Sequence, residues 1–243
     1  MSLHGIFDPM VRSYFEKKYA GGSGGADELI VKMASNQNYE LKSDAVISVS
    51  DRAFESNFDL EAVYFPNAKN IGAEAFEKCA LLKSAHFESA TDIGSSAFEQ
   101  SGIENTKFPS VTNIGYGAFG MTKSLKNASF PSAITVDTSA FNNSALEKVD
   151  FGAVENIKDG CFYNCENLTA VIIRTTTTVC VVDLTAFENT PMLTGMGYIY
   201  VPAAMYEYYR AGYEPAMNAA GYTGLFDILF RKIEDYPDIC GVV

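Results

Sequence analysis

The sequence predicts an α/β solenoid: a right-handed superhelix of about seven coils with short strands, capped at both ends. Three observations lead to this prediction. A motif recurs about every 22 residues, apolar and polar residues alternate at a fixed place in each unit, and both flanks differ in composition from the middle. Periods of 20 to 50 residues are typical of chains that stack one supersecondary unit per coil.

The recurring motif is an Ala-Phe pair, or Cys-Phe in one unit, with a branched aliphatic residue four positions before the Ala or Cys. The last step is longer because "RTTTT" (residues 174–178) is interpreted as an insertion. Single units cannot bury their Phe rings, whereas stacked units can. The aliphatic residues are Val49, Ile71, Ile93, Ile114, Val136, Ile157 and Val182.

A short strand is expected in each unit after the Ala-Phe pair. Apolar residues occupy the first, fourth and sixth positions of a stretch such as Leu60, Val63 and Phe65, and polar residues alternate with the last two. This period of two is typical of a half-buried strand. Pro66 and Pro109 follow such stretches, and proline ends a strand because it lacks an amide donor.

Small residues follow each Phe by three positions from the second unit on, and this column explains two of the five cysteines. We therefore expect Cys79 and Cys165 to be small core side chains and not nucleophiles. The cysteine spacings match no zinc site, and with only two histidines no metal, cofactor or catalytic residue is predicted. The column is Cys79, Ser101, Thr122, Ser144, Cys165 and Thr190.

Together these columns resemble the BspA-like (Treponema pallidum type) leucine-rich repeat, over about residues 49–201. The resemblance implies a leucine-rich-repeat superhelix that serves as a non-enzymatic binding scaffold. Members of that family are mostly bacterial or protist proteins, often on the cell surface, and some are linked to adhesion. The resemblance thus implies bacterial surface recognition of proteins or of a host matrix, as an adhesin does.

One motif suggests a different function. "GYGAFG" (residues 115–120) matches the G-x-G-x-x-G pattern of dinucleotide-binding loops, which needs a strand before it and a long helix after it. Here Gly115 is the repeat glycine equivalent to Gly72 and Gly94, and the Ala-Phe pair follows it. We therefore assign the loop to the repeat and expect no nucleotide cofactor.

The charge and hydropathy of the chain exclude two classes of partner, nucleic acid and the membrane interior. A net charge of −12 repels nucleic acid, and no apolar run is long enough for membrane insertion. No signal-peptide pattern is visible at the N-terminus, so the localisation stays open between a cell-surface or secreted location, which the resemblance implies, and the cell interior. The alternative function is an intracellular or phage-like assembly component docked through an N-terminal helix.

The candidate binding face is the outward side of the repeat strands. Two roles for these side chains remain open. They form a surface that binds a protein or surface glycan ligand, or they form a solvated ladder whose only role is to help neighbouring coils stack. One outward column ends at Ile172 and the other at Ala170, and a third column at the strand entry alternates in charge between neighbours. The candidate residues are Tyr64, His86, Lys107, Ser129, Asp150, Asn105, Asn127 and Lys148.

Four segments divide the chain: residues 1–25 (helix and glycine linker), 26–48 (N-terminal cap with short strands), 49–201 (repeats) and 202–243 (C-terminal helical cap). The first helix is expected to cover the first repeat or to dock on another chain, which would make a homo-oligomer. Its candidate docking residues are Phe7, Met10, Val11, Tyr14 and Phe15.

The C-terminal cap is expected to hold two short helices broken near Pro215, because proline removes a helix hydrogen bond. Six apolar or aromatic side chains are expected to seal the last coil: Met205, Tyr208, Tyr209, Tyr213, Leu225 and Phe226.

Overall fold

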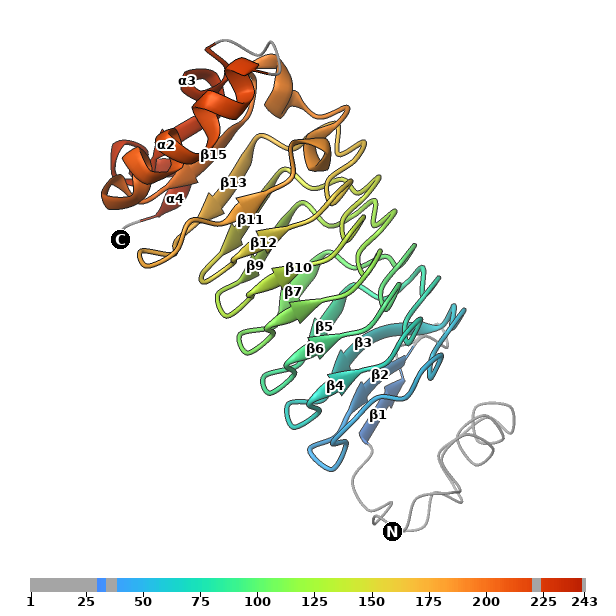
Figure 1. Ribbon diagram of the computed structural model, residues 1–243. Helices are drawn as coiled ribbons and strands as arrows, with labels where there is room; N and C mark the ends of the chain where they lie inside the picture. The colour runs from blue at the N-terminus through green and yellow to red at the C-terminus, as the bar shows by residue number, and fades with distance from the viewer. Residues whose placement is uncertain (1–29, 34–38, 220–223, 242–243) are drawn as a thin grey trace.

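The computed structural model describes residues 30–33, 39–219 and 224–241, with the side chains of 30–33, 39, 105 and 107 outside the description. Its coils stack in one row, as Figure 1 shows. Each coil contributes a long strand, a short strand and a passage of turns, so the solenoid has three sides. The predicted superhelix of short strands is confirmed.

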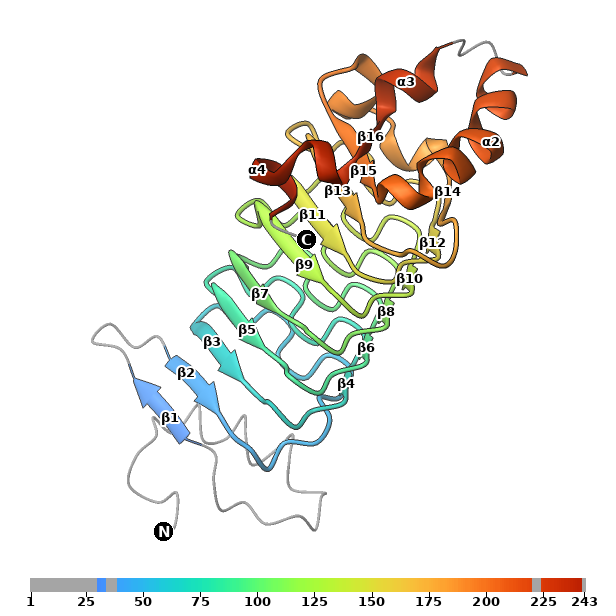
Figure 2. The same ribbon diagram turned by 90° about the vertical axis from the view of Figure 1, so that its left-hand side faces the viewer.

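The long strands form two five-stranded sheets that meet between β7 and β9 (Figure 2). Within them β1 pairs antiparallel with β2, and every other pairing is parallel. The strands are β1 (Ile30–Met33), β2 (Tyr39–Lys42), β3 (Leu60–Tyr64), β5 (Ser84–His86), β7 (Asn105–Lys107), β9 (Asn127–Phe130), β11 (Lys148–Phe151), β13 (Ala170–Ile173), β15 (Tyr198–Val201) and β16 (Phe230–Lys232).

The short strands form one six-stranded parallel sheet along the second side. Each contains the branched aliphatic residue of the repeat motif, and Val49 adds an isolated bridge to Ile71 before the first of them. These strands are β4 (Asn70–Ile71), β6 (Asp92–Ile93), β8 (Asn113–Ile114), β10 (Thr135–Val136), β12 (Asn156–Ile157) and β14 (Val181–Val182).

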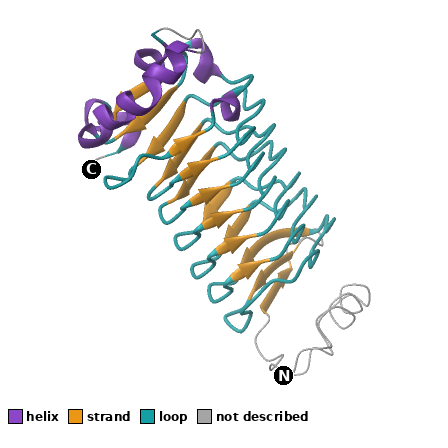
Figure 3. Ribbon diagram, viewed as in Figure 1, coloured by secondary structure: helices purple, strands orange, loops and turns teal. Residues whose placement is uncertain are grey.

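The third side consists of the Ala-Phe passages, which Figure 3 shows as turns. The residue before the Ala and the second residue after the Phe adopt left-handed backbone, as at Glu74 (φ 56°) and Lys78 (φ 59°). This costs about 1 kcal/mol for a residue with a Cβ. The amides of Glu74, Phe76 and Lys78 donate to carbonyls of the next coil at 2.8, 2.7 and 2.8 Å. These bonds offset the strain and make a third ladder between coils.

Two columns of phenylalanine rings fill the core. Phe76, Phe98 and Phe119 are fully buried and stack with centroids 5.1 and 5.3 Å apart. Rings that follow the long strands, such as Phe87 and Phe108, interleave with them at 6.0 and 5.6 Å from Phe76 and Phe98, respectively. Stacked and edge-on rings at such distances add to the burial of apolar area.

Helices gather at the C-terminal end, where α2 and α3 cover the last coil (Figure 1). The predicted break near Pro215 is wrong, because α2 continues past it and thereby buries Met217 at its end. Tyr208 was expected to seal the last coil but is 65% exposed. The helical elements are η1 (Leu184–Phe187), η2 (Pro191–Thr194), α2 (Ala203–Ala219), α3 (Leu225–Leu229), η3 (Ile233–Asp235) and α4 (Pro237–Cys240).

Two tyrosines of α2 close the edge of the short-strand sheet at β14. The Tyr209 hydroxyl accepts a hydrogen bond from the Cys180 amide at 2.9 Å. The Tyr213 hydroxyl accepts from the Val182 amide at 2.5 Å and donates to the Cys180 carbonyl at 2.7 Å. An open sheet edge is a template for pairing with other chains, and these hydroxyls occupy it.

Candidate functional site

The outward side of the long strands, which we term the strand face, brings the predicted columns side by side. Tyr64 is the register partner of His86, and His86 that of Lys107. Lys42 of β2 precedes Tyr64 in the same row. Because neighbouring strands lie about 4.8 Å apart, these four residues form one continuous row across the N-terminal sheet.

Contacts within this row involve rings and a cation. The ammonium of Lys42 lies 4.7 Å from the centroid of the Tyr64 ring, and the rings of Tyr64 and His86 lie 5.9 Å apart. Tyr64 and His86 are half-buried and Lys42 is exposed. Lys107 is placed by backbone register alone. Sequence analysis missed Lys42, because it lies in the segment before the first repeat motif.

The remaining candidate residues lie in two rows of the strand face. Ser129 is the register partner of Asp150, and Asn127 that of Lys148. Ser129 and Asn127 are exposed, whereas Asp150 and Lys148 are half-buried. At the strand entry, where alternating charges were predicted, Lys126 and Glu147 form an ion pair of 3.1 Å.

The C-terminal part of the strand face is covered by the chain itself. Residues 233–240, which we term the C-terminal segment, pass over β13 and β15 (Figure 2). Ala170, Ile172 and Tyr200 point outward and are nevertheless buried against Ile233 and Cys240. The expected outward column therefore ends before Ile172. In the sequence, the apolar side chains at the outward positions of β13 were the signal that another segment covers this part of the strand face.

Polar contacts fix the C-terminal segment in place. Arg174 donates to the Cys240 carbonyl at 2.5 Å and forms a two-point ion pair with Asp150. Lys148 donates to the Ile239 carbonyl at 3.3 Å. The hydrogen bonds that Arg174 donates to Asp150 raise the pKa of its guanidinium, although partial burial opposes this. Two of the predicted binding residues, Asp150 and Lys148, are thus engaged within the chain.

A shallow hollow lies where the C-terminal segment meets the strand face. Asn127 and Lys148 line it from the strands, and Asp238 and Ile239 from the segment. Tyr198 and the largely exposed Met196 complete its apolar side. Through the exposed Asn127, the hollow borders β9.

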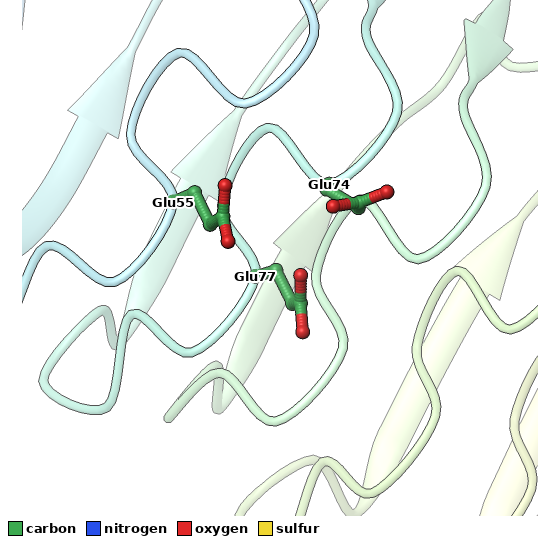
Figure 4. Close-up of side chains that lie close together, drawn as sticks. All are labelled: Glu55, Glu74 and Glu77. Atoms are coloured by element: carbon green, nitrogen blue, oxygen red, sulfur yellow. The ribbon is translucent and has the colours of Figure 1, made fainter.

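Three carboxylates meet on the turn side of the first coils, and Figure 4 shows Glu55, Glu74 and Glu77 there. Each takes part in an ion pair: Arg52 lies 2.7 Å from Glu74 and 3.8 Å from Glu55, and Lys78 lies 2.5 Å from Glu77. The hydrogen bond from Arg52 lowers the pKa of Glu74. The cluster joins neighbouring coils through charge pairs.

All five cysteines are free thiols and buried. The thiol of Cys79 donates to the Phe54 carbonyl at 3.0 Å, and that of Cys165 to the Phe141 carbonyl at 3.0 Å. Burial raises the pKa of the Cys165 thiol and so disfavours the reactive thiolate. These positions agree with the small-residue column of the sequence.

The candidate docking helix, with Phe7, Met10, Val11, Tyr14 and Phe15, lies outside the described residues. Within the ranges that the structure describes, no helix combines the length and the apolar composition that a membrane crossing requires.

A family model matches the repeats of this chain. None of the curated proteins matches the chain. Among solved structures, a leucine-rich repeat protein from Bacteroides ovatus ATCC 8483 is 20% identical with a TM-score of 0.42, over 79% of this chain; this chain spans 65% of that one. The profile of the BspA type leucine rich repeat region matches in six copies, over residues 32–119 and 91–202. Since these ranges cover more than half of the 243 residues, the chain belongs to the BspA type leucine-rich-repeat family.

Proposed function

We propose that this protein is a non-enzymatic recognition protein of a bacterial cell surface, adhesin-like, which binds a protein or surface glycan through the exposed part of the strand face, from β2 to β9. The observation that carries this proposal is the set of in-register rows of polar and aromatic side chains on that face. Leucine-rich repeats of this kind are interaction scaffolds, and the family match supports this general role.

The rigidity of the long strands favours ligand recognition by the strand face itself over recognition by a displayed loop. The rows stand on parallel strands whose inner side chains, Val63 and Ala85 among them, are fully or almost fully buried. Side chains held on a packed sheet lose little further conformational entropy when a ligand binds. A scaffold of this kind is suited to a ligand that lies across several strands.

The first test of the surface role is whether the protein is exposed on the outside of intact cells. Intact source cells are treated with protease, and an antibody to the repeat region detects cleavage. Cleavage on intact cells supports the adhesin-like role. Protection until lysis contradicts it and favours the alternative, an assembly component docked through the N-terminal helix, whose residues lie outside the described ranges.

Binding to a panel of immobilised extracellular-matrix proteins and surface glycans tests the strand face itself. Ser129→Arg places a large side chain on an exposed position of β9, and we expect it to abolish binding. Ile134→Arg is the matched control, because Ile134 is 39% exposed in the loop before β10, away from the long strands. Equal binding by the two variants would contradict the assignment of the face.

A further inference from the structure

We propose that the N-terminal part of the strand face recognises an acidic peptide segment of a partner protein, through the row Lys42, Tyr64, His86 and Lys107. This inference rests on the recognition function proposed above and names the chemistry of its partner. It follows from the charge of the row, from the contacts of its side chains, and from the segment that covers the other part of the same face.

The row is cationic on an acidic protein. The chain has 30 Asp and Glu against 18 Lys and Arg, and its net charge is −12. In the row, two lysines flank a tyrosine and a histidine, and no carboxylate interrupts them. The row itself therefore offers lysines and no carboxylate to an acidic segment.

The carboxylates nearest in register are held in other rows. Glu40 and Glu61 precede the row, and Asp44 and Glu88 follow it by two positions. In the entry column glutamates alternate with Lys83 and Lys126. The contact that the structure describes for the Lys42 ammonium is with the Tyr64 ring. A cation over a ring keeps its charge available to a carboxylate, since the ring does not neutralise it.

The C-terminal segment shows how the strand face holds a peptide. It carries the acidic residues Glu234, Asp235 and Asp238, and its Tyr236 packs edge-on against Tyr200 at 5.4 Å. Arg174 and Lys148 donate to its backbone carbonyls, as described above.

The N-terminal row repeats these parts, with an aromatic ring at Tyr64 and lysines on either side. From the charge of its two lysines we assign to it a segment with carboxylates for Lys42 and Lys107. By analogy with Tyr236 on Tyr200, this segment has an aromatic side chain that packs on the rings of Tyr64 and His86. The Tyr64 and His86 rings, 5.9 Å apart and half-buried, form a platform on which such a side chain would exclude water.

The experiment selects peptides from a random short-peptide library on the immobilised full chain, and sequences those retained. We expect enrichment in Asp and Glu together with an aromatic residue. A retained peptide, labelled with a fluorophore, then gives dissociation constants by anisotropy for the wild type and for Lys42→Glu and Lys107→Glu. Charge reversal is expected to weaken binding about tenfold or more, and rising salt to weaken binding to the wild type.

Lys69→Glu is the matched control, because Lys69 is exposed in the loop before β4, away from the long strands. We expect it to change the dissociation constant by less than about twofold. If it weakens binding as much as Lys42→Glu, net charge alone explains the effect and the proposed row is wrong. Circular dichroism melting curves verify that all variants fold.

The outcomes separate this inference from the function on which it rests. Retained peptides without acidic enrichment, whose binding is lost in Ser129→Arg, overturn the acidic partner and leave recognition by the strand face standing. Retained peptides whose binding is unaffected by Ser129→Arg, Lys42→Glu and Lys107→Glu overturn both. A library from which no peptide is retained also overturns the acidic partner, and the matrix-protein panel then decides the function alone.

Discussion

Arg174 binds Asp150 through two hydrogen bonds of 2.8 and 2.7 Å, and the same guanidinium donates to the Cys240 carbonyl at 2.5 Å. One side chain therefore joins β11, the beginning of the insertion after β13, and the end of the chain. Charge-assisted bonds of this geometry are among the stronger ones in proteins. Arg174 is therefore a polar anchor of the C-terminal segment, together with Lys148.

Replacement of Arg174 is expected to loosen that segment and expose Cys240. In Arg174→Met, loss of charge-assisted bonds worth about 1.5–3 kcal/mol should raise the rate of native-state labelling of the Cys240 thiol by about tenfold or more. Mass spectrometry after timed labelling measures it. Cys79 and Cys165 should stay unlabelled in both proteins. Lys158→Met, which removes a surface ion pair with Asp137, is the control. Unchanged labelling of Cys240 would show that Arg174 does not anchor the segment.

Truncation of one central ring tests the phenylalanine column. Phe119 is fully buried between Phe98 and Phe141, each with its centroid 5.3 Å away. Phe119→Ala should lower the free energy of unfolding by about 3–5 kcal/mol. Tyr116→Ala, at a 54% exposed position in the same coil, should change it by less than about 0.5 kcal/mol. Urea denaturation compares the two, and similar losses would mean that the column does not dominate stability.

Removal of the Tyr213 hydroxyl tests the closure of the short-strand edge. In Tyr213→Phe the Val182 amide loses its acceptor and the Cys180 carbonyl loses a donor. We expect a loss of about 1–3 kcal/mol and faster hydrogen exchange at the Val182 amide. Tyr208→Phe, on the exposed side of α2, should leave the exchange rate unchanged. An equal rate in both variants would contradict the role of Tyr213.

Two glycines should respond to alanine in opposite directions. A Cβ on Gly152 would lie 1.7 Å from the Pro131 carbonyl oxygen of the preceding coil, so Gly152→Ala should destabilise by about 3 kcal/mol. Gly212 lies inside α2 with nothing within 4 Å of its added Cβ. Gly212→Ala should stabilise by about 0.5–1 kcal/mol. Thermal melting of both variants measures the sign, and destabilisation by Gly212→Ala would disprove the second expectation.

Alkaline pH should destabilise the fold. Burial raises the pKa of Tyr200 and Tyr213 to about 12, and that of Cys240 to about 11. These groups ionise at a lower pH in the unfolded chain than in the folded protein. Their stabilising contribution is therefore fully present below their ordinary pKa, and it is lost as pH rises through their pKa in the folded protein. The free energy of unfolding should fall from about pH 9 towards pH 12. Urea midpoints across this range measure it. Tyr200→Phe should flatten the slope, and an unchanged slope would remove Tyr200 from the explanation.

The repeat made the solenoid predictable, because seven near-copies of one pattern show which residues share an environment. The buried positions of Ala118 and Phe119 follow from their column and from no single unit. The contacts of the C-terminal segment occur once, with Arg174 and Cys240 separated by 66 positions, and no second copy of this pattern marks them. At Pro215 the local rule that proline ends a helix fails, because continuation of α2 buries Met217.

The left-handed passages were not foreseen for a related reason. Their backbone conformation is usually marked by glycine, but most of these positions hold other residues, Glu74 and Lys78 among them. Hydrogen bonds to the next coil determine the conformation there, and those bonds exist only after stacking.

The three ladders between coils also determine how the molecule would respond to a pulling force. Neighbouring coils are held together by hydrogen bonds on all three sides except between β7 and β9, whose long strands belong to separate sheets, and most of these bonds join residues about 22 positions apart. A force applied to the two ends loads the terminal coils first, because an inner coil cannot detach while both neighbours hold it. Each detached coil then releases about 75 Å of extended chain, since a residue spans about 3.4 Å. As a tether the solenoid would lengthen in equal steps, one coil at a time, while the coils still stacked keep their strand face intact.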